Sequence, residues 1–247
     1  GWSGWAIHTY AYGTRLHDMH ILGKEVSSAT IGNVSYREGI FSTWNDPAKY
    51  GLFYHAALIA RRQDVAIAPE AAAVRVTDLV SRQEYKDLAM AAEWKRVGAT
   101  FDETDPAAQE TVPQGTPLLE DIGEITSVTG ELYRSWAKNY GTIDTPRTKC
   151  VYGFLKKNGE IALDGLKVSS STDFCVLAVS SLTDAAIRVS DNLLLTAVGR
   201  AQNTGAKFDG DQMLEYGRPP VIIEVIEATI TLDVENPNMK VWAVNAE

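Results

Sequence analysis

Four ionisable side chains near the start of the sequence could supply donors for a metal ion. His8, His17, Asp18 and His20 lie close together in the chain. Zinc is held by three or four histidine, cysteine or carboxylate ligands at characteristic spacings. His17 and His20 have no third ligand at such a spacing, so the sequence predicts no metal ion, and no other cofactor is expected.

Two pairs of charged residues in the second half could be read as catalytic groups. Glu224 and Glu227 lie three residues apart in a strand-like run, where they would point to opposite faces and could not act together. Asp144 and Arg147 lie on either side of Pro146, which fixes a turn leading into a strand. We expect these two charges to pair with each other or with backbone groups. No catalytic residue is therefore predicted from these patterns.

The composition is that of an ordinary globular protein and excludes two classes of partner. Hydrophobic residues make up 45% and charged residues 22% of the 247 residues, which suffice for one large domain or two. The net charge of −9 would repel a phosphate backbone, so nucleic acid is not an expected partner. No apolar run approaches the roughly 18–20 residues that span a bilayer, so no membrane partner is expected either.

The first part of the sequence predicts a strand, a long loop and a helix in that order. Residues 5–12 are aromatic and β-branched and end at a glycine, which is typical of a strand. Asp46 and Pro47 are a helix start, because aspartate caps free amides and proline fits the first turn. This helix should end near Arg61 and Arg62, whose charges complement its dipole. One such β/α unit cannot form a stable sheet alone.

The middle of the chain predicts less regular structure. Residues 71–76 are a short strand or a connector, and residues 81–97 predict a second helix. Residues 98–116 are rich in Thr, Asp, Glu, Pro and Gln, which predicts a linker.

Short strands separated by turn residues dominate the last part of the chain. Turn signals occur at Asn158-Gly159, Asp164-Gly165 and Asp209-Gly210. Eight or nine short strands with this spacing indicate a β-sandwich or barrel. The expected strands are residues 125–128, 132–136, 140–143, 150–154, 165–169, 174–180, 193–200, 221–230 (a strand pair or one bent strand) and 241–244.

The two cysteines, Cys150 and Cys175, each lie within one of these strand-like runs. Buried free thiols are common in protein cores. The sequence favours two buried thiols over a disulfide between them, and it leaves both states open.

Several segments resemble those of a known enzyme family. Residues 41–52 (FSTWNDPAKYGL), continued to residue 65, resemble the start of the final barrel helix in bacterial (β/α)₈-barrel glycoside hydrolases of the large retaining superfamily, which includes cellulases. Residues 1–12 (GWSGWAIHTYAY) match the eighth strand of such a barrel. Residues 141–148 (GTIDTPRT) and 195–205 (LTAVGRAQNTG) resemble signatures of the β-sandwich appended to the same enzymes.

This resemblance implies a mainly β chain in which a β-sandwich of about eight or nine strands follows the last β/α unit of a (β/α)₈ barrel. Residues 1–80 would hold the final barrel strand and helix with a connector, residues 81–118 a helix and linker, and residues 119–247 the sandwich. Both catalytic glutamates of the family would lie upstream of Gly1, together with any export signal. A lone final strand cannot assemble the two carboxyl groups, about 5–5.5 Å apart, that a retaining mechanism requires.

The resemblance also implies a function and its partners. We expect a non-catalytic C-terminal portion of a polysaccharide-degrading glycoside hydrolase, extracellular or periplasmic, whose partners are a polysaccharide or oligosaccharide and the upstream barrel. A dedicated carbohydrate-binding module and one chain of a split or nicked active glycosidase are the alternatives.

Aromatic rings pack well on the C–H faces of sugars, and the loop after strand eight would lie at the catalytic face. The same rings could instead fill the barrel or the seam between barrel and sandwich. In a binding module, Trp136 and Tyr140 would form one aromatic platform together with Tyr133 and Tyr152. The candidate sugar-binding residues are Tyr10, Tyr12, His17, Trp44, Trp136 and Tyr140.

Overall fold

The protein is mainly β and contains several sheets, as the sequence predicted. The computed structural model describes residues 47–69, 71–77, 82–109, 111–121, 123–210, 212–215 and 217–244. The strand predicted over residues 5–12 and the loop that follows it lie outside these ranges. So does Asp46, the predicted cap of the first helix.

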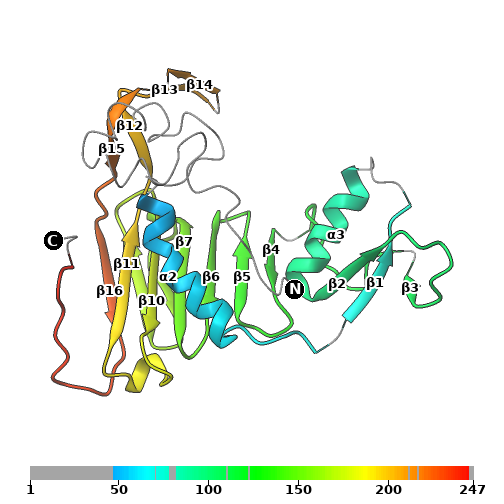
Figure 1. Ribbon diagram of the computed structural model, residues 1–247, viewed down its shortest axis with the longest axis horizontal. Coiled ribbons are helices and arrows are strands. Elements are labelled where there is room, and N and C mark those ends of the chain that lie inside the picture. The colour runs from blue at the N-terminus through cyan, green and yellow to red at the C-terminus, as the bar shows by residue number, and fades with distance from the viewer. Residues whose placement is uncertain are drawn as a thin grey trace, which may run out of the picture.

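The largest element is a six-stranded antiparallel sheet in the order β11-β10-β7-β6-β5-β4 (Figure 1). Its side chains alternate between two faces, as in any strand. Tyr133, Thr142, Val151 and Leu177 are paired across β5, β6, β7 and β10 and therefore share one face. The strands are β4 (Glu124–Thr126), β5 (Leu132–Ser135), β6 (Tyr140–Asp144), β7 (Thr148–Phe154), β10 (Phe174–Ser181) and β11 (Leu193–Val198).

A three-stranded antiparallel sheet covers that face. It consists of β8 (Ile161–Leu163), β9 (Leu166–Ser170) and β16 (Ala228–Leu232), in the order β16-β9-β8. The apolar side chains between the two sheets are removed from water, and this burial stabilises the fold. The core cluster is Val151, Leu155, Ile161, Leu166, Val168, Cys175 and Leu177.

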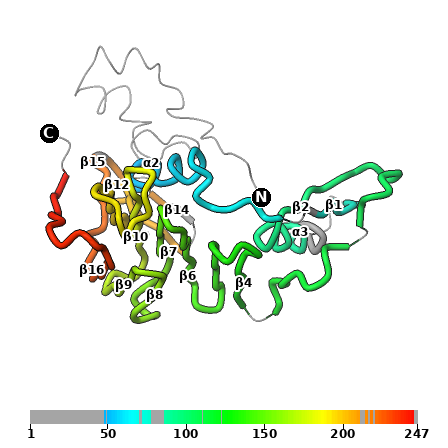
Figure 2. The backbone as a smooth tube through the Cα atoms, turned by 90° about the horizontal axis from the view of Figure 1, so that it is seen from below, coloured from blue at the N-terminus to red at the C-terminus, as the bar shows by residue number. Residues whose placement is uncertain are grey.

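Helix α2 (Pro47–Arg62) lies on the opposite face of the six-stranded sheet (Figures 1 and 2). It contacts β10 and β11. The approach is close at Gly51, where an added Cβ atom would lie 3.0 Å from Val198 Cγ2. The predicted helix start at Pro47 and its end at Arg62 are both confirmed.

Residues 71–109 contain a parallel arrangement that the sequence predicted only in part. Strand β1 (Ala71–Arg75) pairs in parallel with β2 (Arg96–Thr100) and with β3 (Ala108–Gln109), and α3 (Arg82–Trp94) connects β1 to β2. The second helix therefore ends before Val97, which the sequence had placed within it, because Val97 pairs with Ala72 in the sheet. Pairing with β1 overrides the local helical pattern.

Two two-stranded sheets, called the small ribbons below, extend from the end of the large sheet. Strand β12 (Ala201–Thr204) pairs with β15 (Arg218–Ile223), and β13 (Lys207–Asp209) pairs with β14 (Gln212–Glu215). The run predicted over residues 221–230 is thus divided between β15 and β16, which belong to different sheets. Two short 3₁₀ helices, Lys156–Asn158 and Ile187–Val189, complete the described elements.

The strand predicted over residues 241–244 was wrong: these residues are not in a strand. Val241 is 95% exposed and Trp242 is 77% exposed. Strand propensity largely expresses the packing of side chains on a sheet, so a β-type sequence does not form a strand without neighbours.

Cys150 and Cys175 are free and buried, so the prediction of buried thiols is confirmed. Cys175 belongs to the core between the sheets, whereas Cys150 lies next to Val151 on β7 and therefore faces the side on which α2 lies. Burial raises the pKa of Cys150 to about 12 and also raises that of Cys175.

We expect neither cysteine to react with Ellman's reagent in the folded protein, because the reactive thiolate is suppressed and neither sulfur is accessible. Absorbance at the thionitrobenzoate wavelength should show reaction of both thiols only in guanidinium chloride. Rapid reaction of either thiol without denaturant would contradict this burial.

Candidate functional site

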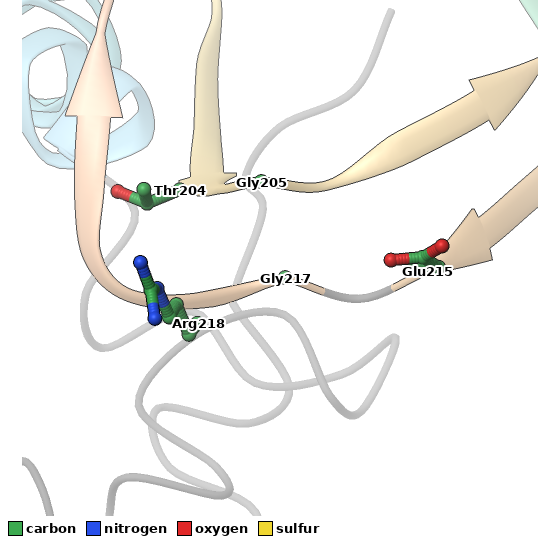
Figure 3. A pocket seen from close by; sticks show the side chains of 5 residues that line it. All are labelled: Thr204, Gly205, Glu215, Gly217 and Arg218. Atoms are coloured by element: carbon green, nitrogen blue, oxygen red, sulfur yellow. The ribbon is translucent and has the colours of Figure 1, made fainter.

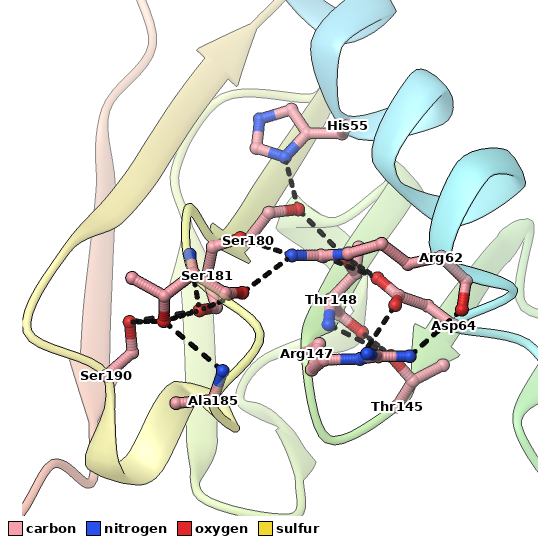
Figure 4. Close-up of polar contacts among 11 residues, drawn as sticks. His55, Arg62, Asp64, Thr145, Arg147, Thr148, Ser180, Ser181, Ala185 and Ser190 are labelled. Carbon is pink, nitrogen blue, oxygen red and sulfur yellow. Dashed lines mark hydrogen bonds and ion pairs between the residues drawn. The ribbon is translucent and has the colours of Figure 1, made fainter.

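A fully buried carboxylate, Asp64, lies where α2 ends against the six-stranded sheet (Figure 4). Its Oδ2 atom accepts hydrogen bonds from Arg62 Nη2 at 2.6 Å and from Thr148 Oγ1 at 2.9 Å. Its Oδ1 atom lies 2.9 Å from Arg147 Nε, an ion pair without the angle of a hydrogen bond. Two arginines from different elements thus share one buried anion.

The same two arginines also bind the backbone. Arg62 Nη1 donates to the carbonyl oxygens of Ser181 at 2.7 Å and Thr183 at 3.0 Å, at the end of β10. Arg147 Nη2 donates to the carbonyl oxygen of Arg62 at 3.0 Å. The end of the helix is therefore fixed to the turn before β7 and to the end of β10.

His55 makes a second connection about two turns before Arg62 in α2. Its Nδ1 lies 2.8 Å from Ser180 Oγ on β10, and its Nε2 lies 2.8 Å from Thr196 Oγ1 on β11. The side chain is 3% exposed, and burial lowers the pKa of His55 to about 4. The imidazole is therefore neutral at pH 7, with one nitrogen donating and the other accepting.

Ser180 joins the two parts, because its hydroxyl also lies 2.9 Å from Thr148 Oγ1. The resulting group is named the anchor network below. It consists of His55, Arg62, Asp64, Arg147, Thr148 and Ser180.

The anchor network contains the residue types of a Ser-His-Asp triad but not its arrangement. In a triad the carboxylate orients the histidine, and the serine reaches the substrate. Here Asp64 bonds to Thr148 and the arginines, and Ser180 is 0% exposed. The arrangement can hold a helix on a sheet, but it cannot present a nucleophile.

Among the residues predicted to bind sugar, Tyr10, Tyr12, His17 and Trp44 lie outside the described ranges. The structure places the other two on opposite faces of the large sheet. Tyr140 packs against the core cluster, on the face of the three-stranded sheet. The Trp136 ring lies 5.1 Å from the guanidinium of Arg134, which faces α3.

The remaining two tyrosines are divided in the same way. Tyr133 lies 5.5 Å from the Tyr140 ring and donates a 2.7 Å hydrogen bond to Glu124. Burial and this hydrogen bond raise the pKa of Tyr133. Tyr152 is paired with Gly141, which is paired with Arg134, so it shares the face of Trp136. The four rings therefore do not form one platform.

The carboxylates considered as catalytic groups are bound to separate partners. Glu224 accepts from the backbone of Arg200, and Glu227 accepts from Ser171. They lie in the connection between β15 and β16, so the expectation that they share a strand was wrong.

The roles expected for Asp144 and Arg147 were closer to the contacts that the structure shows. They do not pair with each other: Asp144 binds Lys149 and the backbone N–H of Asp164, and Arg147 belongs to the anchor network. Both residues do bond to backbone groups, which was the other expected arrangement.

A pocket of about 560 Å³ lies between the small ribbons (Figure 3). Its described lining is Thr204, Gly205, Glu215, Gly217 and Arg218. Glu215 is already paired with Lys207 at 2.5 Å. This lining thus supplies one carboxylate, whereas glycoside hydrolysis requires two. No group of three or more potential metal-ligating side chains occurs among the residues that the structure describes.

The sequence interpretation missed most of the anchor network. The sequence explains Arg62 only by the helix dipole and predicts no role for His55 or Asp64. A usable signal was present, because His55 follows Leu52 by three residues and precedes Ile59 by four, which places it on the apolar face of the helix. Thr148 and Ser180 lie within runs that the sequence marks as strand-like or at their edge, and the structure shows that both are buried.

Comparison with known proteins gives no relative of this chain: no family model, no curated protein and no solved structure matches it. Within the described part of the chain, neither helix has the length and apolar character needed to cross a bilayer.

Proposed function

We propose that this chain is the non-catalytic C-terminal portion of a polysaccharide-degrading glycoside hydrolase, acting outside the cytoplasm. Its β-sandwich, formed by the six-stranded and three-stranded sheets, would hold the last helix of a (β/α)₈ barrel. The observation that carries the proposal is the anchor network, which joins α2 to the sheet through buried polar contacts.

The chemistry of the anchor network suits a fixed joint between two parts of an enzyme. Buried ion pairs contribute little net stability compared with apolar packing, but they penalise any arrangement that separates the charges. A helix held only by apolar contacts could shift along the sheet at small cost. A helix whose following residue Asp64 must reach both Arg147 and Thr148 has one position on the sheet.

The resemblance of residues 41–52 to the start of a final barrel helix supplies the other half of the proposal. The last part of that segment, residues 47–52, begins α2, the helix that the network anchors. The sandwich would then fix the closing helix of the barrel and support the catalytic domain from outside.

The chain alone is expected to release no reducing sugar from barley β-glucan, xylan or mannan, because both catalytic glutamates would lie upstream. A reducing-sugar assay on the purified chain checks this, with circular dichroism to establish that the chain is folded. An active glycoside hydrolase assayed in parallel controls for the substrates. Turnover of any of the three polysaccharides by the folded chain would overturn the proposal.

A dedicated carbohydrate-binding module is the second candidate function. The partly exposed ring of Trp136 favours it, since aromatic rings at protein surfaces can stack on sugars. Affinity electrophoresis separates the two functions: retardation lost on Trp136→Ala favours a binding module, and no retardation favours a purely supporting role.

A further inference from the structure

A row of aromatic and cationic side chains crosses one end of the six-stranded sheet. Phe154 and Phe174 are paired across β7 and β10, and their rings meet edge to face with centroids 5.4 Å apart. Phe154 is 38% exposed, a large fraction for a side chain at the end of a central strand. The two rings thus form an aromatic surface that apolar packing does not cover.

Two cations flank this ring pair. The guanidinium of Arg200 lies 5.9 Å from the centroid of Phe154 and 5.8 Å from that of Phe174. The ammonium of Lys157 lies 5.9 Å from the centroid of Phe154. Each distance is within the range over which a ring face attracts a cation.

Asn139 extends the row beyond Lys157, toward the backbone of the turn between β5 and β6. With its amide oriented to satisfy both neighbours, Asn139 donates to the carbonyl oxygen of Trp136 at 3.0 Å and accepts from Lys157 Nζ at 2.8 Å. The surface made by Asn139, Lys157, Phe154, Phe174 and Arg200 is named the aromatic-cationic strip below.

The strip lies at the end of the sheet where α2 begins. Gly51, in the first turns of α2, approaches Val198, which is paired with Val176, two residues from Phe174. The other end of α2 reaches Ser181, at the far end of β10. Residues 174 and 176 share a face, so the strip and the helix start lie on the same side of the sheet.

The position of the strip beside the start of α2 matters because of the proposed function, on which the inference rests. In a (β/α)₈ barrel the helices begin at the face that carries the active site. If α2 is the last barrel helix, the strip lies beside the catalytic face. A polysaccharide leaving the cleft would then pass over it.

We propose that the aromatic-cationic strip binds a polysaccharide that carries uronic acid residues. Its rings suit the C–H faces of sugars, and Lys157 and Arg200 supply donors for a carboxylate. Arg200 is held by Asp173 at 3.2 Å in a half-exposed pair, which an incoming carboxylate can replace at small cost. The net charge of −9 disfavours a densely charged polyanion, so the expected ligand is a mainly neutral chain with sparse carboxylates.

Affinity electrophoresis with glucuronoxylan tests the proposal on the intact chain. The uncharged control ligand is glucuronoxylan whose carboxylates have been reduced to alcohols. Single-stranded DNA is the polyanion control. We expect retardation by glucuronoxylan that weakens with salt, little retardation by the reduced polymer and none by DNA.

Substitutions then locate the site. Phe154→Ala is expected to weaken retention about tenfold through loss of ring stacking, and Lys157→Gln about fivefold through loss of charge. Phe208→Ala is the matched control, because Phe208 on β13 is 48% exposed and lies outside the strip. It should retain full binding. Lys157→Gln changes only an exposed side chain, so its folding is not in question.

Three results would overturn the proposal: no retardation by glucuronoxylan, equal retardation by the reduced polymer or by DNA, or retention unchanged in both strip variants. Each of these leaves the supporting function standing, since that function needs no glycan contact. Conversely, release of reducing sugar by the chain would overturn the proposed function, while the strip variants would still report whether this surface binds.

Discussion

Replacing Asp64 by alanine is expected to lower the free energy of unfolding by about 3–5 kcal/mol. The substitution leaves the guanidinium groups of Arg62 and Arg147 without their shared anion at a site where the Asp64 side chain is 0% exposed. Urea unfolding followed by circular dichroism measures the change. A loss of this size would identify the buried charges of the anchor network as the joint between α2 and the sheet.

Asp173→Ala is the matched control for that experiment. Asp173 also pairs with an arginine, Arg200, but both side chains of this pair are about half exposed. Exposed ion pairs contribute about 0–1 kcal/mol, so this variant should unfold nearly like the unsubstituted chain. Equal losses for Asp64→Ala and Asp173→Ala would contradict the distinct role assigned to the buried network.

Acidification from pH 7 to pH 4 is expected to remove about 3 kcal/mol of stability through His55 alone. The pKa of His55 is lowered from 6.5 to about 4 in the folded chain because burial disfavours the charged form. The unfolded chain therefore binds a proton more readily than the folded chain. The stabilisation is complete above pH 6.5 and is lost as the pH falls toward 4.

Urea unfolding across this pH interval, with His55→Asn as the control, isolates the effect. The carboxylates titrate in both proteins and cancel in the difference between them. The asparagine variant should start less stable at pH 7 and should lose about 3 kcal/mol less on acidification. Parallel pH profiles for the two proteins would show that His55 titrates in the folded chain as it does in the unfolded chain.

Local patterns allowed much of the secondary structure to be predicted. Pro47 and the apolar spacing after it located α2, and the β-branched runs located β7 and β10. Short strands such as β8 and β13 were missed, because three residues carry too little periodicity to distinguish a strand from a turn.

The site could not be predicted in the same way, because its contacts join distant parts of the chain. Asp64 and Thr148 are 84 residues apart, and His55 and Ser180 are 125 residues apart. No local pattern encodes such pairs. The strands that form β5 and β6 were predicted, yet the aromatic residues at their ends face different ways, since Trp136 packs on Arg134 while Tyr140 faces the core.

The two cysteines offer a way to observe the joint directly. Cys150 and Cys175 lie on neighbouring central strands but on opposite faces of the sheet. One sulfur therefore reports on the helix side and the other on the core between the sheets. Mass-spectrometric labelling of the two thiols can distinguish release of α2, which uncovers one face of the six-stranded sheet, from global unfolding, which uncovers both faces.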